Sequence, residues 1–309
     1  MSYPPLPAFR TLLKSREVED PVNLWLHRPA AYAFVALFYR TPLTPNQITV
    51  LSMVAGVLAS LCWVRGTAQM MIIGGVLMWT SAVLDGADGM LARAKKLSSD
   101  MGRILDGTAD MVVVVAGLIA ASVHLWEQHH SVLQLALIPV AWLTGAMHVY
   151  MYDYYKESYM MMTRPDWDGK PERLAEVRAR IGTLKAAGRH FDAWAVRNYL
   201  GIAEGQAKLV ALCNPLGARD QYTFRVSQES TANYRRHNRG PMRLWALISL
   251  APHMFLFSIF GAVDRIDAYL WLRVVGFNVL FVIASIWQRQ ATRRTRLRLE
   301  ELGLSPVAA

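Results

Sequence analysis

Long apolar runs are the feature that most constrains how this chain can fold. About six of them approach the length of roughly 20 residues that a helix needs to cross a bilayer. They centre on Ile48 to Val64, Met70 to Leu84, Met111 to Trp126, Leu133 to Tyr152, Leu244 to Val263 and Ala268 to Trp287. Hydrophobic residues make up 53% of the chain and charged residues only 18%, which is too apolar for an ordinary soluble domain. The sequence therefore predicts an all-α integral membrane protein with about six transmembrane helices.

The positive charges are placed on alternate sides of these runs. A net charge of +10 could mean nucleic-acid binding, so the distribution of the cations has to decide. Lysines and arginines gather before the first run, between the second and third, from Arg164 to Arg239, and at the C-terminal end, whereas the other connections are poor in them. The positive-inside rule therefore predicts that both termini are cytoplasmic, in the inner membrane if the cell is bacterial. A lipid bilayer is the expected partner, and nucleic acid is not.

The runs divide the chain into five predicted segments. Residues 1–46 would form a cytosolic segment and an amphipathic interfacial helix near Pro21–Arg40, with Thr44 or Asn46 as N-cap of the first span. The remaining segments are 47–157 with four transmembrane helices, 158–240 as a cytosolic helical insertion, 241–290 with two transmembrane helices, and 291–309 as a basic cytosolic tail. Within the insertion, residues 213–224 are typical of a loop. We expect neither a disulfide between Cys62 and Cys213 nor a cleavable signal peptide.

Four carboxylates follow directly on the second apolar run. Asp85 and Asp88 are neighbours on one face of a helix, and Asp106 and Asp110 repeat four residues apart on the next helix. Carboxylates that converge at the edge of a bilayer repel one another unless a cation lies between them. Neither cysteine nor a pair of histidines occurs nearby, so the oxygen ligands favour a hard ion, Mg²⁺ or Mn²⁺. Hard ions held by carboxylates usually serve phosphate chemistry.

The same stretch carries a longer pattern, D-x2-D-G-x2-A-R-x8-G-x3-D-x3-D. It is matched at every fixed position, by Asp85, Asp88, Gly89, Ala92, Arg93, Gly102, Asp106 and Asp110. In this pattern the sequence resembles the CDP-alcohol phosphotransferases. The resemblance implies transfer of a substituted phosphate group from a CDP-linked donor, such as CDP-diacylglycerol, to an acceptor hydroxyl in phospholipid synthesis, with release of CMP. It also implies a homodimer.

The resemblance also implies roles for the matched residues. Asp85, Asp88 and Asp106 would be metal ligands. Asp110 would be the base that deprotonates the acceptor hydroxyl and would also contribute to the metal site. The positions that would line the cytidine and phosphate site are Gly89, Ala92, Arg93 and Gly102.

Several alternatives stay open on the sequence. Arg235, Arg236 and Arg239 could bind an acceptor phosphate, although a positive-inside anchor explains them as well. The acceptor alcohol is not identified by the shared motif, and the arginines favour a phosphorylated polyol only weakly. A cation transporter with an aspartate ion site is the rival function, but its acids would be expected in mid-span and not at one edge. A membrane-anchored binding module is a third possibility, and it leaves the acids unexplained.

Overall fold

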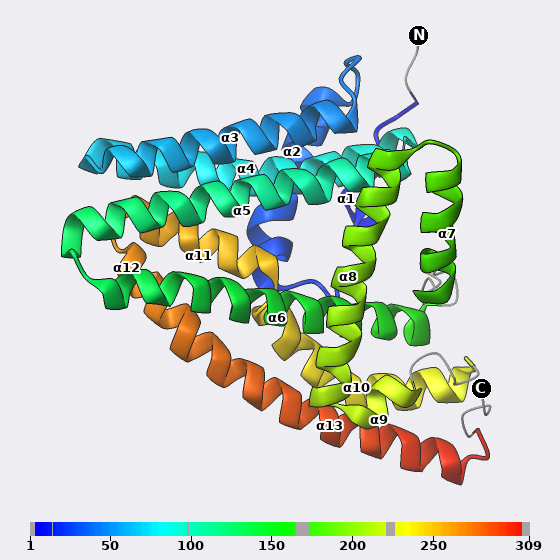
Figure 1. The fold of residues 1–309 in the computed structure, drawn as a ribbon. Helices are drawn as coiled ribbons and strands as arrows, with labels where there is room; N and C mark the ends of the chain where they lie inside the picture. The colour runs from blue at the N-terminus through cyan, green and yellow to red at the C-terminus, as the bar shows by residue number, and fades with distance from the viewer. Residues whose placement is uncertain (1–3, 14, 98, 165–173, 221–225, 305–309) are drawn as a thin grey trace. The chain divides into compact units, whose positions relative to one another are not determined.

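The computed structural model describes the chain except for residues 1–3, 14, 98, 165–173, 221–225 and 305–309 (Figure 1). All of the regular secondary structure in the described part is helical. Six helical segments are long and apolar enough to cross a membrane, namely Pro45–Arg65, Ala68–Lys95, Leu105–His129, Val132–Thr163, Gln228–Ala262 and Ile266–Glu301. The predicted fold class, an all-α protein with six candidate transmembrane helices, is thus confirmed.

The helices fall into two compact units, which are described separately. The first comprises residues 1–145 and 247–278, and the second comprises residues 146–246 and 279–309. The first unit contains α1 (Phe9–Leu12), the π-helical turn η1 (Asn23–His27), α2 (Arg28–Phe38), α3 (Pro45–Arg65), α4 (Ala68–Lys95), α5 (Asp100–His129), the start of α6 (Val132–Thr163), α11 (Leu250–Ala262), α12 (Ile266–Trp271) and the π-helical segment η2 (Leu272–Phe277). The second contains the rest of α6, α7 (Leu174–Ala186), α8 (His190–Cys213), α9 (Pro215–Asp220), α10 (Gln228–Leu247) and α13 (Asn278–Glu301).

The first transmembrane candidate, α3, starts with a complete capping box. The Thr44 side chain accepts a hydrogen bond from the Gln47 N–H at 3.4 Å, and the Gln47 side chain accepts one from the Thr44 N–H at 2.9 Å. Pro45 at the first helical position loses no intrahelical bond. Of the two predicted caps, Thr44 is therefore the one that the structure uses.

Small residues let α3, α4 and their neighbours approach closely. A Cβ added to Gly56 on α3 would lie 2.6 Å from Val113 of α5, and one added to Gly75 on α4 would lie 2.5 Å from Ala262 of α11. Ser52 and Ser81 bond to each other's backbone carbonyls across α3 and α4, at 3.0 and 2.8 Å. Close backbone approach and interhelical hydrogen bonds are how helices associate in lipid. The α3 helix packs in this way against both α4 and α5.

The N-terminal segment is packed onto α2 and α4. Leu12 and Val18 are almost fully buried, and Leu12 belongs to the same apolar cluster as Ala31 of α2 and Met90 of α4. The predicted helix at residues 21–40 is present as η1 and α2. Its position at a bilayer interface stays a prediction.

The fifth candidate span, Gln228–Ala262, consists of two helices, because α10 ends at Leu247 and α11 begins at Leu250. Pro252 has no backbone N–H, so the Ile248 carbonyl lacks the donor that a continuous helix would supply four residues later. The helix is interrupted at that point.

The second unit also differs from the sequence expectation at one place. Residues 213–224 are typical of a loop, but Pro215–Asp220 form the short helix α9. Asn214 explains the difference, because its side chain accepts a hydrogen bond from the Gly217 N–H at 3.1 Å, and Pro215 suits the first helical position. Two helices of the predicted insertion, α7 and α8, pack against each other.

Candidate metal centre

Two helix ends and the turn between them position the predicted acidic residues. The α4 helix continues past its apolar part to Lys95, so that Asp85 and Asp88 share one regular helix. It ends at Lys96, whose positive φ of 55° turns the chain, and α5 begins after Ser99, whose hydroxyl accepts a hydrogen bond from the Gly102 N–H at 3.0 Å. Because the chain reverses direction between α4 and α5, Asp106 lies beside the aspartates of α4.

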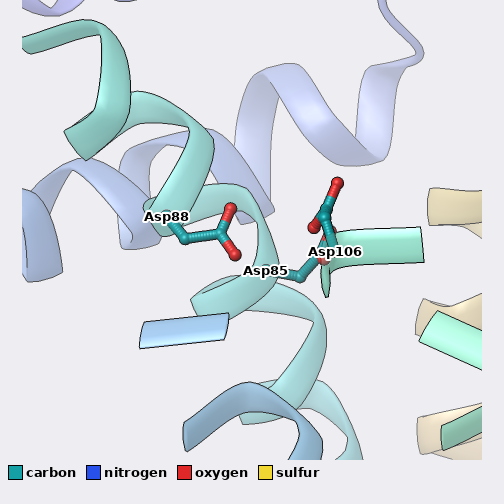
Figure 2. A group of neighbouring side chains, drawn as sticks. All are labelled: Asp85, Asp88 and Asp106. Atoms are coloured by element: carbon teal, nitrogen blue, oxygen red, sulfur yellow. The ribbon is translucent and has the colours of Figure 1, made fainter. Parts of the chain in front are cut away.

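Three of the four aspartates meet. Asp85, Asp88 and Asp106 can each offer one carboxylate oxygen such that all three oxygens lie within 4.8 Å of one another. Figure 2 shows these side chains pointing toward one another from two different helices. Asp88 is buried, and the other two are half-buried. The Asp110 side chain lies close to the Asp85 carboxyl group, so the fourth aspartate neighbours this cluster.

A threonine on a third helix holds one of the acids. The Thr49 hydroxyl, buried near the start of α3, hydrogen-bonds to the Asp88 carboxylate and lies 3.2 Å from the Pro45 carbonyl oxygen. Sequence reasoning missed Thr49. Its only signal was a polar residue at the start of the first apolar run.

The oxygen atoms of this group fit a hard divalent cation. In the described part of the chain, Asp85 and Asp88 form no salt bridge with a lysine or arginine. Carboxylates this close together repel one another, and three of them supply the anionic oxygen ligands that Mg²⁺ and Mn²⁺ prefer. The donor set therefore matches the predicted metal type.

The remaining motif positions lie beside the acids. A Cβ added to Gly89 would meet only the Arg93 Nη1 atom, at 3.6 Å, so the backbone of α4 is open there. Ala92 is half-buried on the next turn. A Cβ added to Gly102 would lie 3.1 Å from Ser99 and 3.2 Å from Asn46, so a side chain there would crowd the start of α5.

The predicted arginine cluster belongs to the second unit. Arg235, Arg236 and Arg239 are exposed on α10, and Arg235 donates a hydrogen bond to the Thr163 carbonyl at 3.2 Å. They belong to a different unit from the motif, and their role in acceptor binding stays a prediction.

The described chain thus combines six helical segments of membrane-spanning length with a cluster of three carboxylates whose oxygen atoms suit a hard cation. Comparison with known proteins gives a match for part of the chain. A family model described as CDP-alcohol phosphatidyltransferase matches residues 42–179. This match confirms the predicted resemblance, and the matched segment includes every residue of the acidic motif.

Three curated relatives match shorter segments. A bifunctional IPC transferase and DIPP synthase from Aquifex aeolicus is 38% identical over 82 residues, covering 26% of this chain and 18% of that protein. A protein of the same name from Rubrobacter xylanophilus is 30% identical over 103 residues, covering 32% of this chain and 23% of that protein. An archaetidylinositol phosphate synthase from Pyrococcus horikoshii is 38% identical over 68 residues, covering 22% of this chain and 35% of that protein. The chain thus spans about a third or less of the length of these relatives.

Proposed function

We propose that this chain is a metal-dependent transferase that moves a substituted phosphate group from a CDP-linked donor to the hydroxyl of an acceptor and releases CMP. The observation that carries the proposal is the meeting of Asp85, Asp88 and Asp106 at the ends of α4 and α5, within the segment that matches the CDP-alcohol phosphatidyltransferase family. CDP-diacylglycerol is the proposed donor, because a lipid-linked donor suits an enzyme built from membrane-type helices.

In this proposal the aspartates divide two tasks. Asp85, Asp88 and Asp106 hold the divalent ion, which when bound neutralises the diphosphate and stabilises CMP as a leaving group. Asp110 takes the proton of the acceptor hydroxyl as that oxygen forms its bond to phosphorus and the bond from phosphorus to CMP breaks. The open backbone at Gly89 admits the donor, with Ala92, Arg93 and Gly102 lining its nucleotide and phosphate.

The acceptor proposed first is a polyol phosphate. The name of the Pyrococcus horikoshii relative refers to an inositol phosphate lipid, and that relative matches over 68 residues. The cations on α10, Arg235, Arg236 and Arg239, are candidates for the acceptor phosphate. Cytoplasmic placement of the site and both termini, and a homodimer, complete the proposal and stay untested predictions.

The test is release of CMP by the purified full-length chain in detergent or lipid. CDP-diacylglycerol, Mg²⁺ and one acceptor at a time are supplied, with inositol phosphate, glycerol phosphate, inositol and serine compared. We expect acceptor-dependent CMP release that chelation of Mg²⁺ abolishes and that returns when Mg²⁺ or Mn²⁺ is added. Asp192→Asn, which removes a carboxylate on α8 outside the motif, is the matched control and keeps the activity.

A cation transporter, the rival function, would release no CMP under any of these conditions. The family match does not favour it. Absence of CMP release with every donor and acceptor, together with Mg²⁺-dependent ion uptake into vesicles, would decide for the rival.

A further inference from the structure

The N-terminal segment is tied directly to the arginine of the motif. The Arg93 Nε atom donates a hydrogen bond to the Leu12 carbonyl oxygen at 3.0 Å, across 81 positions of sequence. Leu12 itself is almost fully buried in the apolar cluster that includes α4. The guanidinium is thereby fixed at one edge by a backbone carbonyl that cannot rotate away.

A second arginine and a buried glutamate complete this group. The Glu19 carboxylate forms an ion pair with the Arg28 Nε atom at 3.1 Å, and the glutamate side chain is only 4% exposed. Arg28 Nη1 lies 3.4 Å from the Gly86 carbonyl oxygen, one turn before Gly89 on α4. Arg93 lies within electrostatic range of Arg28, Glu19 and Asp88. The Glu19 carboxylate is therefore paired with the Arg28 guanidinium and lies within electrostatic range of the Arg93 guanidinium.

Two charged atoms of this group remain without a hydrogen-bond partner. The Arg93 Nη2 and Glu19 Oε1 atoms are both buried, and neither has a partner within the described part of the chain. An unsatisfied buried charged group is costly, so it requires an explanation such as a bound ligand. The nearest open backbone is at Gly89, where only the Arg93 guanidinium would meet an added Cβ. The Arg93 guanidinium, which carries the unpartnered Nη2 atom, is thus next to the place where the donor is proposed to approach α4.

We propose that Leu12 and Glu19 take part in the nucleotide site: the Leu12 carbonyl anchors the Arg93 guanidinium and the nearby Glu19 carboxylate stabilises its charge, so that the unpartnered Nη2 donates to a phosphate oxygen of the CDP-linked donor. This inference rests on the proposed function. Glu19 is a positioning residue, because it acts through Arg93 and touches no reacting atom. Its Arg28 partner keeps the carboxylate in place and contributes a second positive charge.

The competing explanation is structural. In that explanation the contacts of Leu12 and Glu19 only fasten the N-terminus to α2 and α4, and their loss lowers stability without selecting one substrate. The two explanations differ in what happens once Arg93 is already gone. A positioning residue has nothing left to position, whereas a structural contact still contributes.

The experiment is a kinetic double-mutant cycle on the full-length enzyme. CMP release is measured for the wild type, Glu19→Gln, Arg93→Gln and the double variant, with the KM for CDP-diacylglycerol, the KM for the acceptor and the half-activating Mg²⁺ concentration. We expect Glu19→Gln to raise the donor KM about tenfold and to change the acceptor KM and the Mg²⁺ requirement by less than about twofold. In the Arg93→Gln background, Glu19→Gln should have no further effect on the donor KM.

Two controls keep the test decisive. Glu204→Gln breaks another carboxylate–guanidinium pair, with Arg178 in the second unit, and should leave the donor KM unchanged. Glu19→Asp keeps the charge but shortens the side chain, so it should give an intermediate donor KM, and it serves if Glu19→Gln does not fold. Effects of Glu19 and Arg93 that multiply, or an equal rise in both KM values, would overturn the inference while leaving the transferase standing. A wild type that releases no CMP would instead refute the proposed function itself.

Discussion

Each unit contains a group of interior polar side chains. The group in the second unit is a hydrogen-bonded network of neutral side chains, whereas the group in the first unit is a cluster of carboxylates. In the second unit, Asn238 donates to the Thr295 hydroxyl at 2.9 Å and accepts from the Gln288 Nε2 atom at 2.8 Å. That network is neutral, and Asn238, Gln288 and Thr295 are absent from the buried side chains of the described residues that lack a hydrogen-bond partner. In the first unit, Asp85, Asp88 and Asp106 bring like charges together, with the Thr49 hydroxyl on one of them.

This difference indicates a structural role for the neutral network and a binding role for the carboxylates. Neutral amides and hydroxyls alternate as donors and acceptors, so the network between α10 and α13 holds two helices in register with no further partner. Carboxylates have acceptors only, and a group of them needs something positive to complete it. The predictions that follow test this contrast, from the largest expected effect to the smallest.

Removing one carboxylate from the metal centre should have the largest effect. Asp85→Asn, Asp88→Asn and Asp106→Asn each take one anionic ligand from the site, so we expect CMP release to fall by at least roughly a thousandfold. Folded protein should be recovered in nearly normal amounts, because less repulsion remains. CMP release at limiting and saturating Mg²⁺ is the measurement. Near-normal turnover of any variant at limiting Mg²⁺ would show that this residue is not a ligand.

Asp110→Asn should differ in kind from these three. Losing the base while keeping most of the metal ligation should lower kcat by roughly two to four orders of magnitude and leave Mg²⁺ affinity within about tenfold. Calorimetric Mg²⁺ titration of Asp110→Asn beside Asp106→Asn is the deciding measurement. If both variants lose metal to the same extent, Asp110 is mainly a ligand and the base lies elsewhere.

A side chain at Gly89 should affect one substrate and not the other. Gly89→Leu fills the open backbone of α4, so the KM for the CDP-linked donor should rise by roughly ten- to a hundredfold, with the acceptor KM nearly unchanged. Gly205→Leu on α8 is the matched control, because a Cβ there meets nothing within 4 Å and the residue lies outside the motif. Equal increases in both KM values would indicate damage to helix packing.

The membrane helices and the acidic site were predictable because their signals are local. Apolar runs mark the spans, and intervals of three and four residues place Asp85 beside Asp88 and Asp106 beside Asp110 on helix faces. Because the turn between α4 and α5 is short, the sequence could also predict that the aspartates of the two helices lie near one another.

What the sequence did not reveal depends on contacts between distant positions. Thr49 reaches Asp88 across 39 residues, and Arg93 reaches Leu12 across 81, so neither pairing leaves a periodic pattern. The interruption between α10 and α11 did have a local cause in Pro252, but a strongly apolar run concealed it. The helix α9 was missed for a different reason, because its proline and glycine are typical of loops.

Breaking the neutral network should cost stability and spare chemistry. Asn238→Leu leaves Gln288 and Thr295 without their partner, so we expect a loss of about 1–3 kcal/mol in the free energy of unfolding. CMP release per folded molecule should stay within about twofold. The double variant Asn238→Leu/Gln288→Leu removes both members of one hydrogen bond and should recover part of the loss. A fall in kcat larger than tenfold in folded protein would mean that the network is not purely structural.

His27 offers the smallest and most selective test, because it is a titratable group that is buried without a charge partner. The residue is 2% exposed, and its Nε2 atom lacks a hydrogen-bond partner in the described structure. Its ring packs edge-on against the Phe255 ring, with 5.9 Å between the ring centroids. Burial lowers the pKa of His27 to about 4 from its usual 6.5. Between these two values the unfolded chain binds a proton that the folded chain does not, so stability is fully present above about pH 6.5 and falls as the pH drops toward 4. The slope is roughly 1 kcal/mol per pH unit, which corresponds to a few degrees in the unfolding temperature.

His27→Phe keeps an apolar ring and should remove that part of the slope, whereas His129→Phe, at the exposed end of α5, should not. Unfolding temperatures measured from pH 4.5 to 7.5 in detergent check this, and coinciding slopes for the wild type and His27→Phe would show that the His27 ring is accessible to protons in the folded protein.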